Sequence, residues 1–335
     1  MYSSLKRVSR NRCKLDPSPG ELFFSLMDYK NNYFISNNPY KIIEFYNSLR
    51  GRDELFQWMK ERPNGVCQIH EVEGNKEIIV VIPTPDFDGD LAKECREKIF
   101  NGLHIVFVES GEIPDDYFRG AHNYNVGIKK ALEYDPRWII IGVDDFFKID
   151  NIEKLKRELA EIDDREVSAV FGIQSRNSKI GLAQISRPTF AFGPLLVLRF
   201  LITNKRGKYS RVILALKTLK LYAKYQVSLI SSRRRLVSSI ALKRGFEFSN
   251  FVDLLIISAK FASSVRSPLF DETFINSGED SDLSIDLFYK QIKIKEIDYN
   301  IGNREITRTG AGLNRHLRSL AGMSYLSYKW ETLIK

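Results

Sequence analysis

The sequence predicts an α/β protein with a doubly wound, mainly parallel sheet flanked by helices. Three observations lead to this fold class: short continuous apolar runs typical of strands buried on both faces, helical periodicity in the segments between them, and a regular alternation of the two from residue 77 onward. Such alternation is typical of parallel strands joined by crossover helices. Helical additions are expected at the N-terminal and C-terminal ends of this unit.

Residues 1–76 are expected to form a helical extension before the alternating region. In NNPYKIIEFYNSLR (37–50), Asn38 and Pro39 are a good cap and first turn for a helix. A second helix is expected over DELFQWMKER (53–62), where a Pro-Asn-Gly turn follows and ends it.

The alternation then supplies the strands and helices of the sheet unit. One helix places apolar residues four apart on a single face, and another begins behind Asp150, which is expected to cap it. The expected strands are 77–82, 104–108, 137–143 and 167–173, and the expected helices are 90–100, 125–134 and 151–162.

The chain is expected to have four parts. They are the extension (1–76), a first α/β half (77–185), a second half (186–300) that carries a basic helical insertion over 200–265, and a C-terminal segment (301–335).

The composition is that of a globular protein in a reducing compartment. Of 335 residues, 43% are hydrophobic and 28% are charged, which excludes a disordered chain. Cys13, Cys67 and Cys95 are too widely spaced for a disulfide framework or a zinc site. The N-terminus lacks the apolar stretch of a signal peptide, and no apolar run reaches the ~18–20 residues that span a bilayer. We expect a cytoplasmic protein, or one peripheral to the inner face of a membrane.

The net charge of +9 is unevenly distributed along the chain. The stretch 167–246 contains no Asp or Glu, whereas the rest of the chain is rich in both. A basic partner surface is therefore expected in this stretch.

Polar residues gather where the expected strands end. In open α/β sheets, ligands bind just beyond the carboxyl ends of the strands. The residues at these ends are Pro83, Thr84 and Asp86 after the first strand, Glu109 after the second, and Asp144 and Asp145 after the third.

The pair Asp144 and Asp145 has two interpretations. Acids are favoured at the start of a helix, and a helix is expected soon after them. Alternatively, the two carboxylates supply hard oxygen ligands for Mg²⁺ or Mn²⁺. The sequence has neither a GxGxxG fingerprint nor a P-loop at the first strand, so bound phosphate would need a metal to neutralise it.

A second acidic cluster lies far downstream, at an expected junction between a loop and a helix. It comprises Glu279, Asp280 and Asp282, and Gly278 provides the turn. Capping of the helix remains open as a role for Asp282. A carboxylate at this position is also a candidate general base, if folding brings it opposite the metal site.

The order of these motifs resembles that of the GT-A glycosyltransferases, specifically the inverting enzymes of family 2. Those proteins typically carry an N-x-G-x-x-x-A helix start, an acidic pair that ends a strand, and an E-D motif before an acceptor-side helix. The matching residues are Asn125, Gly127 and Ala131, then Asp144 and Asp145 with Val143 in place of a first acid, then Glu279 and Asp280. The resemblance covers residues 77–300.

The resemblance implies a function and a role for each matching residue. The protein would move a sugar from a nucleoside-diphosphate sugar to an acceptor hydroxyl with inversion. Asp145 would bind the Mn²⁺ or Mg²⁺ that bridges the diphosphate, and Asp144 would contact the ribose or the sugar. Asp280, beside Glu279, would deprotonate the acceptor.

The resemblance also implies a donor pocket, an acceptor side and further metal ligands. Asn125, Gly127 and Asp86 would belong to the donor site. Pro83 and Thr84 would line the nucleoside pocket, and Glu109 stands where the family often has an Asp that reads the nucleobase. The first α/β half would bind the donor and the second the acceptor, with Phe192, Gly193 and Asp282 on the acceptor side. His316 would complete the metal shell, and His122 would face the diphosphate.

The acid-free stretch leaves further alternatives open. Residues 199–244 are expected to contain a helix with one apolar face, formed by Ile213, Leu216, Leu219, Leu221 and Tyr222. This helix would either lie on an anionic membrane or be a core helix with a solvated basic face. Membrane binding would suit a lipid-linked acceptor, although glycan and protein acceptors are equally compatible. The competing functions are a metal-dependent nucleotidyltransferase and a nucleic-acid-binding protein without catalysis, which would leave both acidic clusters unexplained.

Overall fold

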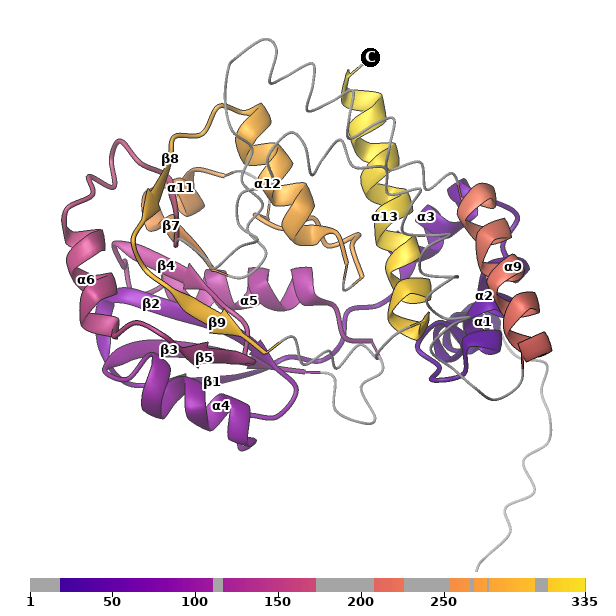
Figure 1. Ribbon diagram of the computed structural model, residues 1–335, viewed down its shortest axis with the longest axis horizontal. Coiled ribbons are helices and arrows are strands. Elements are labelled where there is room, and N and C mark those ends of the chain that lie inside the picture. Colours follow the sequence, from indigo (N-terminus) through magenta and orange to yellow (C-terminus); the bar gives the residue numbers. More distant parts are fainter. Residues whose placement is uncertain are drawn as a thin grey trace, which may run out of the picture.

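The expected α/β class is confirmed by a computed structural model of the chain. A seven-stranded sheet is flanked by helices, and a second group of helices packs at one end of it (Figure 1). The structure describes residues 19–110, 117–172, 208–225, 254–265, 268–275, 277–304 and 313–334.

The sheet has the strand order β1-β3-β2-β4-β7-β6-β8. β2 pairs in parallel with β3 and β4, and β6 pairs in parallel with β8, whereas the β1–β3, β4–β7 and β6–β7 pairs are antiparallel. The strands are β1 (Gln68–Val72), β2 (Asn75–Thr84), β3 (Leu103–Glu109), β4 (Trp138–Ile141), β6 (Ala169–Gly172), β7 (Leu255–Ser258) and β8 (Ile294–Ile297).

The sheet is therefore mixed, and its continuous parallel part is β3-β2-β4. The four expected strands are present as β2, β3, β4 and β6. All three antiparallel pairs involve β1 or β7, short strands that the sequence pattern did not predict. β1 lies within the expected N-terminal extension, and β7 lies within the expected insertion.

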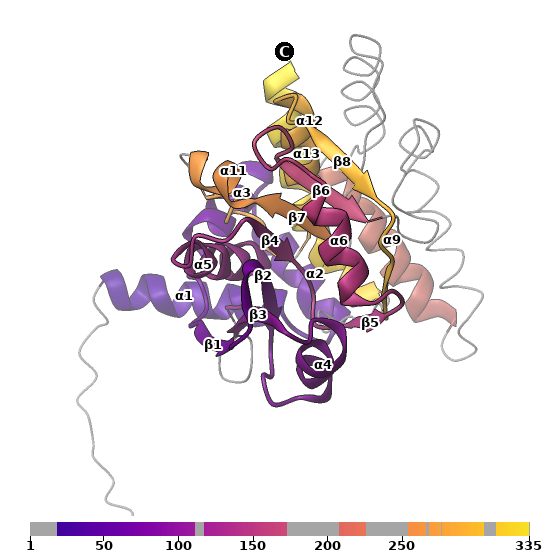
Figure 2. The ribbon, with the colours of Figure 1, turned by 90° about the vertical axis from the view of Figure 1, so that its left-hand side faces the viewer.

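Helices cover both faces of the sheet. Figure 2 shows α5 on one side of it and α4 and α6 on the other. The helices of this unit are α4 (Asp90–Glu94), which continues as a π-helix over Cys95–Ile99, α5 (Gly120–Leu132), α6 (Ile152–Ala160), α11 (Ala259–Ser264) and α12 (Glu279–Tyr289).

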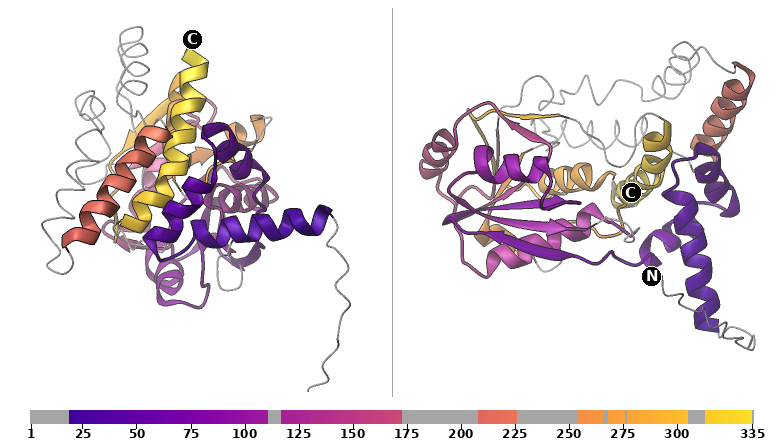
Figure 3. Two further views of the ribbon diagram at one scale, coloured as in Figure 1. Left: turned by 90° about the vertical axis from the view of Figure 1, so that its right-hand side faces the viewer. Right: turned by 90° about the horizontal axis from the view of Figure 1, so that it is seen from below.

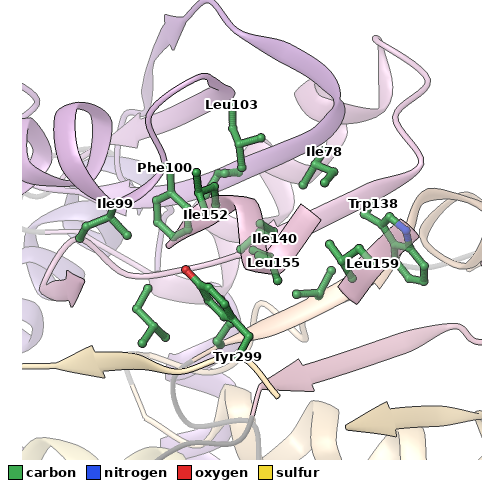
Figure 4. Close-up of a cluster of buried hydrophobic side chains, with 14 of the residues drawn as sticks. Ile78, Ile99, Phe100, Leu103, Trp138, Ile140, Ile152, Leu155, Leu159 and Tyr299 are labelled. Carbon is green, nitrogen blue, oxygen red and sulfur yellow. The ribbon is translucent and has the colours of Figure 1, made fainter. Parts of the chain in front are cut away.

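Alternate residues of β2 supply two separate cores, as expected for a strand buried on both faces. Ile78, Val80 and Ile82 pack toward α4 and α6, in the cluster that Figure 4 shows. Ile79 and Val81 pack toward α5 and α12 on the opposite face.

The cap of α6 differs from the expected one. Asn151 caps the helix, since its side chain accepts a hydrogen bond from the Glu153 N–H at 3.3 Å. Asp150 instead accepts from the Asn300 N–H at 2.8 Å and from Lys154 Nζ at 3.1 Å. Asp150 therefore anchors the segment before β9 (Ile301–Asn303), which pairs with β5 (Phe146–Lys148) in a small second sheet.

A third core joins the two ends of the described chain. The expected helices over 37–50 and 53–62 are present as α2 and α3, and Asn38 caps α2 as expected. The Tyr46 hydroxyl donates to the Leu317 carbonyl at 2.7 Å, so the N-terminal helices pack on the C-terminal one (Figure 3). The helices of this group are α1 (Pro19–Phe34), α2 (Pro39–Ser48), α3 (Arg52–Glu61), α9 (Lys208–Lys224) and α13 (Leu313–Ile334).

Within the described part of the chain, no helix has the length and hydropathy needed to cross a membrane.

Candidate functional site

The acidic pair Asp144 and Asp145 lies in the turn between β4 and β5. Each residue is 9% exposed. The next helix, α6, begins only at Ile152 and has its own cap, so the helix-start interpretation of the pair is wrong. The pair stands at the carboxyl edge of β4, beside the ends of the parallel strands β2 and β3.

Contacts from three other segments hold this turn. The Thr84 hydroxyl, at the end of β2, donates to Asp144 Oδ2 at 2.9 Å. The Cys95 thiol lies 3.5 Å from the Asp144 carbonyl oxygen, to which it donates. The Arg304 backbone N–H donates to the Asp145 carbonyl oxygen at 3.0 Å. Two residues expected at the donor site, Thr84 and Asp144, are therefore in direct contact.

The surroundings of this turn carry negative charge. Burial, and then the nearby Asp144, Glu94 and Asp145 carboxylates, raise the pKa of the Cys95 thiol far above its usual range. The Arg304 guanidinium counters this effect in part, and it binds Glu94 at 2.7 Å. Buried carboxylates in such surroundings favour a bound cation.

The second cluster lies at the start of α12, where Gly278 has the positive φ of +96° that the turn requires. Asp282 Oδ2 accepts from Lys329 Nζ at 2.8 Å, and its Oδ1 accepts from Trp330 Nε1 at 2.9 Å. Both partners lie on α13. The Asp282 carboxylate therefore ties α12 to α13, and within the described part of the chain it makes no capping bond.

Glu279 and Asp280 differ in their surroundings. Glu279 Oε2 is inaccessible to solvent and has no hydrogen-bond partner among the described residues. Burial, followed by the charge of Asp280, raises the pKa of Glu279 to about 8. The Asp280 Oδ1 accepts a hydrogen bond from the Ser281 N–H at 2.7 Å. Burial therefore favours the protonated form of the Glu279 carboxyl near neutral pH.

The phenol of Tyr124, on α5, links the two acidic clusters. Burial, and then Glu279, Asp280, Asp144 and Asp145 in that order, raise the pKa of Tyr124 far above its usual range. Each of the four carboxylates thus acts on the same hydroxyl group. Folding has brought together two clusters that lie far apart in the sequence. Tyr124 was not among the expected site residues, since a tyrosine within a helix gives no specific signal.

Tyr124 is itself held by two contacts. Its hydroxyl donates to the Gly142 carbonyl oxygen at 3.2 Å, just before the acidic turn. Its ring stacks on Phe270, with the ring centroids 4.9 Å apart. The phenol remains protonated at any working pH, so it acts as a hydrogen-bond donor to the turn.

Glu109 lies on the same edge, at the end of β3, and its carboxylate has partners of its own. Oε2 lies 2.6 Å from His70 Nε2, and Oε1 accepts from the Phe87 N–H at 2.9 Å. The His70 ring stacks on Phe87, with centroids 4.3 Å apart. His70 comes from β1, and it was missed because β1 was not predicted.

Asn125 and Gly127 hold α5 against its neighbours. The Asn125 amide donates to the Phe270 carbonyl oxygen at 2.8 Å and accepts from the Phe270 N–H at 3.0 Å. A Cβ on Gly127 would lie 2.3 Å from Val81 Cγ1, so only glycine lets the helix approach β2 this closely. These contacts give both residues a structural role, and their expected donor-site role remains a prediction.

The remaining expected residues have varied surroundings. Pro83 is part-buried at the end of β2, and Asp86 Oδ1 accepts from the Asp88 N–H at 3.1 Å in the loop that follows. His122 Nδ1 lies 3.0 Å from Glu272 Oε2. Phe192, Gly193 and the side chain of His316 lie outside the described residues.

Comparison with known proteins assigns no family to the chain. No family model matches it, and neither a curated protein nor a solved structure does. Among the described residues, no group of three or more His, Cys, Asp or Glu side chains is arranged to hold a metal ion.

Proposed function

We propose that this protein is a metal-assisted, inverting glycosyltransferase of the GT-A type. It would move a sugar from a nucleoside-diphosphate sugar to an acceptor hydroxyl. The observation behind the proposal is the packing of α5, which carries Tyr124, against both α12 and β4, so that the two acidic clusters lie near the Tyr124 hydroxyl. A donor-side acidic pair and an acceptor-side acid must face one reaction centre in such an enzyme, and the order of the sequence motifs assigns the clusters to these two sides.

Asp145, with Asp144 beside it, would hold Mn²⁺ or Mg²⁺. The donor set fits these ions, because both side chains are buried carboxylates in negatively charged surroundings. Mg²⁺ usually binds through one or two carboxylates and the phosphates of the substrate, so two protein ligands are enough. When bound, the cation would neutralise charge on the leaving diphosphate as a Lewis acid.

The residues of the chain would divide the remaining work. Thr84 fixes the orientation of Asp144 through its hydrogen bond. Asp280 would accept the proton of the acceptor hydroxyl as that hydroxyl attacks the anomeric carbon. Burial raises the pKa of the neighbouring Glu279, so a proton on Glu279 would keep a second charge away from Asp280. Contacts with His70 and the Phe87 N–H fix the orientation of the Glu109 carboxylate, which would face the nucleobase.

The donor is tested first by thermal unfolding with UDP, GDP, dTDP and CMP, each with and without Mn²⁺. A ligand at one hundred times its dissociation constant adds about 2.7 kcal/mol to stability, which raises the midpoint by several degrees. We expect one nucleotide to shift the wild type only with Mn²⁺, and Asp145→Ala to abolish the shift.

Asp298→Ala is the matched control, since the Asp298 side chain is 68% exposed and pairs only with Lys154 in the described structure. This variant should keep the full shift. The proposal would be contradicted if no nucleotide raised the unfolding temperature. It would also be contradicted if the nucleotide shift were the same without Mn²⁺ and in Asp145→Ala. A shift with nucleoside triphosphates alone, followed by pyrophosphate release, would identify a nucleotidyltransferase instead.

Catalysis is tested by release of the nucleoside diphosphate from the sugar donor that this screen identifies. Asp280→Asn keeps the size of the side chain and removes its basicity. We expect turnover to fall by about 10²- to 10⁴-fold, the usual contribution of a general base. The Mn²⁺-dependent nucleotide shift of this variant should remain, because Asp280 would act on the acceptor side.

A further inference from the structure

The acid-free stretch contributes one described helix, α9, and the proposed reaction makes no use of it. α9 packs in the third core at the side of the molecule away from the sheet (Figure 1). Leu214, Thr218, Leu221 and Tyr225 are buried, at the spacing of one helical face. Lys224 donates to the Tyr46 carbonyl oxygen at 3.0 Å and so fastens the helix to α2.

The opposite face of α9 presents apolar and basic side chains together. Ile213 is 44% exposed and Leu216 is 54% exposed, and Lys217 and Lys220 beside them are exposed as well. Lys217 Nζ lies 5.6 Å from the ring centroid of Tyr40, which is 37% exposed. We call these five residues the α9 outer face. The expected single apolar face is therefore wrong, since Leu221 points into the core and Ile213 and Leu216 do not.

We propose that the α9 outer face docks on an anionic lipid bilayer. Lysines, aliphatic side chains and a tyrosine at one surface are the combination that binds the interface of a membrane. The lysines would meet the lipid phosphates, and Ile213 and Leu216 would enter the acyl boundary. The surrounding stretch 167–246 has no acidic residue to repel a negative surface.

A lipid surface fits this face better than a nucleic acid does. Lysines and tyrosine are common to both kinds of site, but exposed aliphatic side chains gain nothing from phosphate contacts. Burial of Ile213 and Leu216 in a lipid interface removes them from water, which is a favourable step. The α9 outer face contains none of the residues of the acidic clusters, so its binding to lipid is independent of the proposed transfer reaction.

The test is sedimentation of the full chain with vesicles of phosphatidylcholine, with and without phosphatidylserine. We expect binding only to the vesicles that contain phosphatidylserine, and weaker binding at high salt. Lys217→Gln with Lys220→Gln should reduce the binding constant roughly 10- to 30-fold, since each lysine near an anionic surface contributes about fivefold. Ile213→Ser with Leu216→Ser should reduce it about tenfold.

The control is Lys93→Gln with Lys98→Gln, which removes two exposed lysines from the sheet unit. It should bind the vesicles as the wild type does, and all variants should keep the wild-type unfolding temperature because the altered residues are exposed. The proposal is overturned if phosphatidylserine does not increase vesicle binding by the wild type, or if both α9 variants bind the vesicles as well as the control does. Binding of single-stranded RNA that depends on the lysines, together with unchanged vesicle binding by the serine variant, would overturn it in favour of nucleic acid.

Discussion

The hydroxyl of Tyr124 donates a hydrogen bond to the carbonyl oxygen of Gly142 over 3.2 Å. This bond joins α5 to the turn that carries Asp144 and Asp145. Burial, and then the charges of the Glu279 and Asp280 carboxylates from α12, raise the pKa of the same hydroxyl. Tyr124 therefore stands where the sheet edge, α5 and α12 meet, and it positions the acidic turn without itself being acidic.

Replacement of Tyr124 by Phe tests this positioning role. The ring stack on Phe270 is kept, while the hydrogen bond to Gly142 is lost. A net loss of about 1 kcal/mol in holding the turn would weaken Mn²⁺ binding roughly fivefold. The measurement is the Mn²⁺ concentration that gives half of the maximal thermal shift. Tyr134→Phe removes a hydroxyl that bonds Glu71 instead, and it should leave Mn²⁺ binding unchanged. Equal Mn²⁺ binding by Tyr124→Phe and the wild type would refute the role.

The raised pKa of Glu279 predicts a pH dependence of stability. Its pKa is about 8 in the folded protein and near 4.5 when unfolded, because burial and the Asp280 charge disfavour ionisation. Between these values the folded state binds more protons than the unfolded state, so the free energy of unfolding falls as pH rises. The loss begins near pH 4.5 and ends above about pH 8.

Urea unfolding of the wild type and Glu279→Gln across this pH range checks the prediction. The glutamine variant should lack the Glu279 contribution, so its stability relative to the wild type should increase from pH 5 to pH 8. Glu153→Gln alters an exposed acid on α6 and should follow the wild type at every pH. Parallel wild-type and Glu279→Gln profiles would show that Glu279 ionises normally.

The link between Asp282 and α13 predicts a large effect on stability. Asp282→Ala leaves Lys329 and the buried Trp330 without this carboxylate, although Lys329 keeps Asp271 at 2.8 Å. Removal of one partner from a buried charge pair typically costs about 3–5 kcal/mol, and we expect the lower part of this range. Asp286→Ala on the same helix breaks an exposed pair with Lys290 and should cost less than about 1 kcal/mol. Similar urea midpoints for the two variants would contradict the structural role of Asp282.

The close approach of α5 to β2 predicts an overpacking effect at Gly127. In Gly127→Ala the new Cβ would lie 2.3 Å from Val81 Cγ1, so the helix must shift, at a cost of about 1–3 kcal/mol. Gly51→Ala is the control, since a Cβ there meets nothing within 4 Å. The double variant Gly127→Ala with Val81→Ala removes the clash. Its loss in free energy of unfolding should therefore be smaller than the sum of the losses of the two single variants. Strict additivity in urea unfolding would show that the clash is not the cause.

Several features follow from short stretches of the sequence. Apolar runs predicted β2, β3, β4 and β6, and the cap and first turn at Asn38 and Pro39 predicted α2. The position of Asp144 and Asp145 at a strand end also followed, because one run of residues contains both the strand and the acids. Such features depend on contacts between residues close in the chain, which local periodicity encodes.

Other features were decided only by the tertiary structure. β1 does not pair with β2, the next strand in the sequence, but with β3. This pairing places the His70 ring within hydrogen-bond distance of the Glu109 carboxylate. Asp282 could have capped α12 but instead meets Lys329 and Trp330 of α13.

The meeting of the two acidic clusters at Tyr124 belongs to this second group. It requires the strand order of the sheet and the packing of α5 against α12 to be set together. The sequence by itself determined the α/β class, the acids at the sheet edge and the basic stretch, since each feature depends on residues that are close together in the chain. Only the tertiary structure decided which of these residues face one another, because contacts between distant segments arise from packing that no local pattern records.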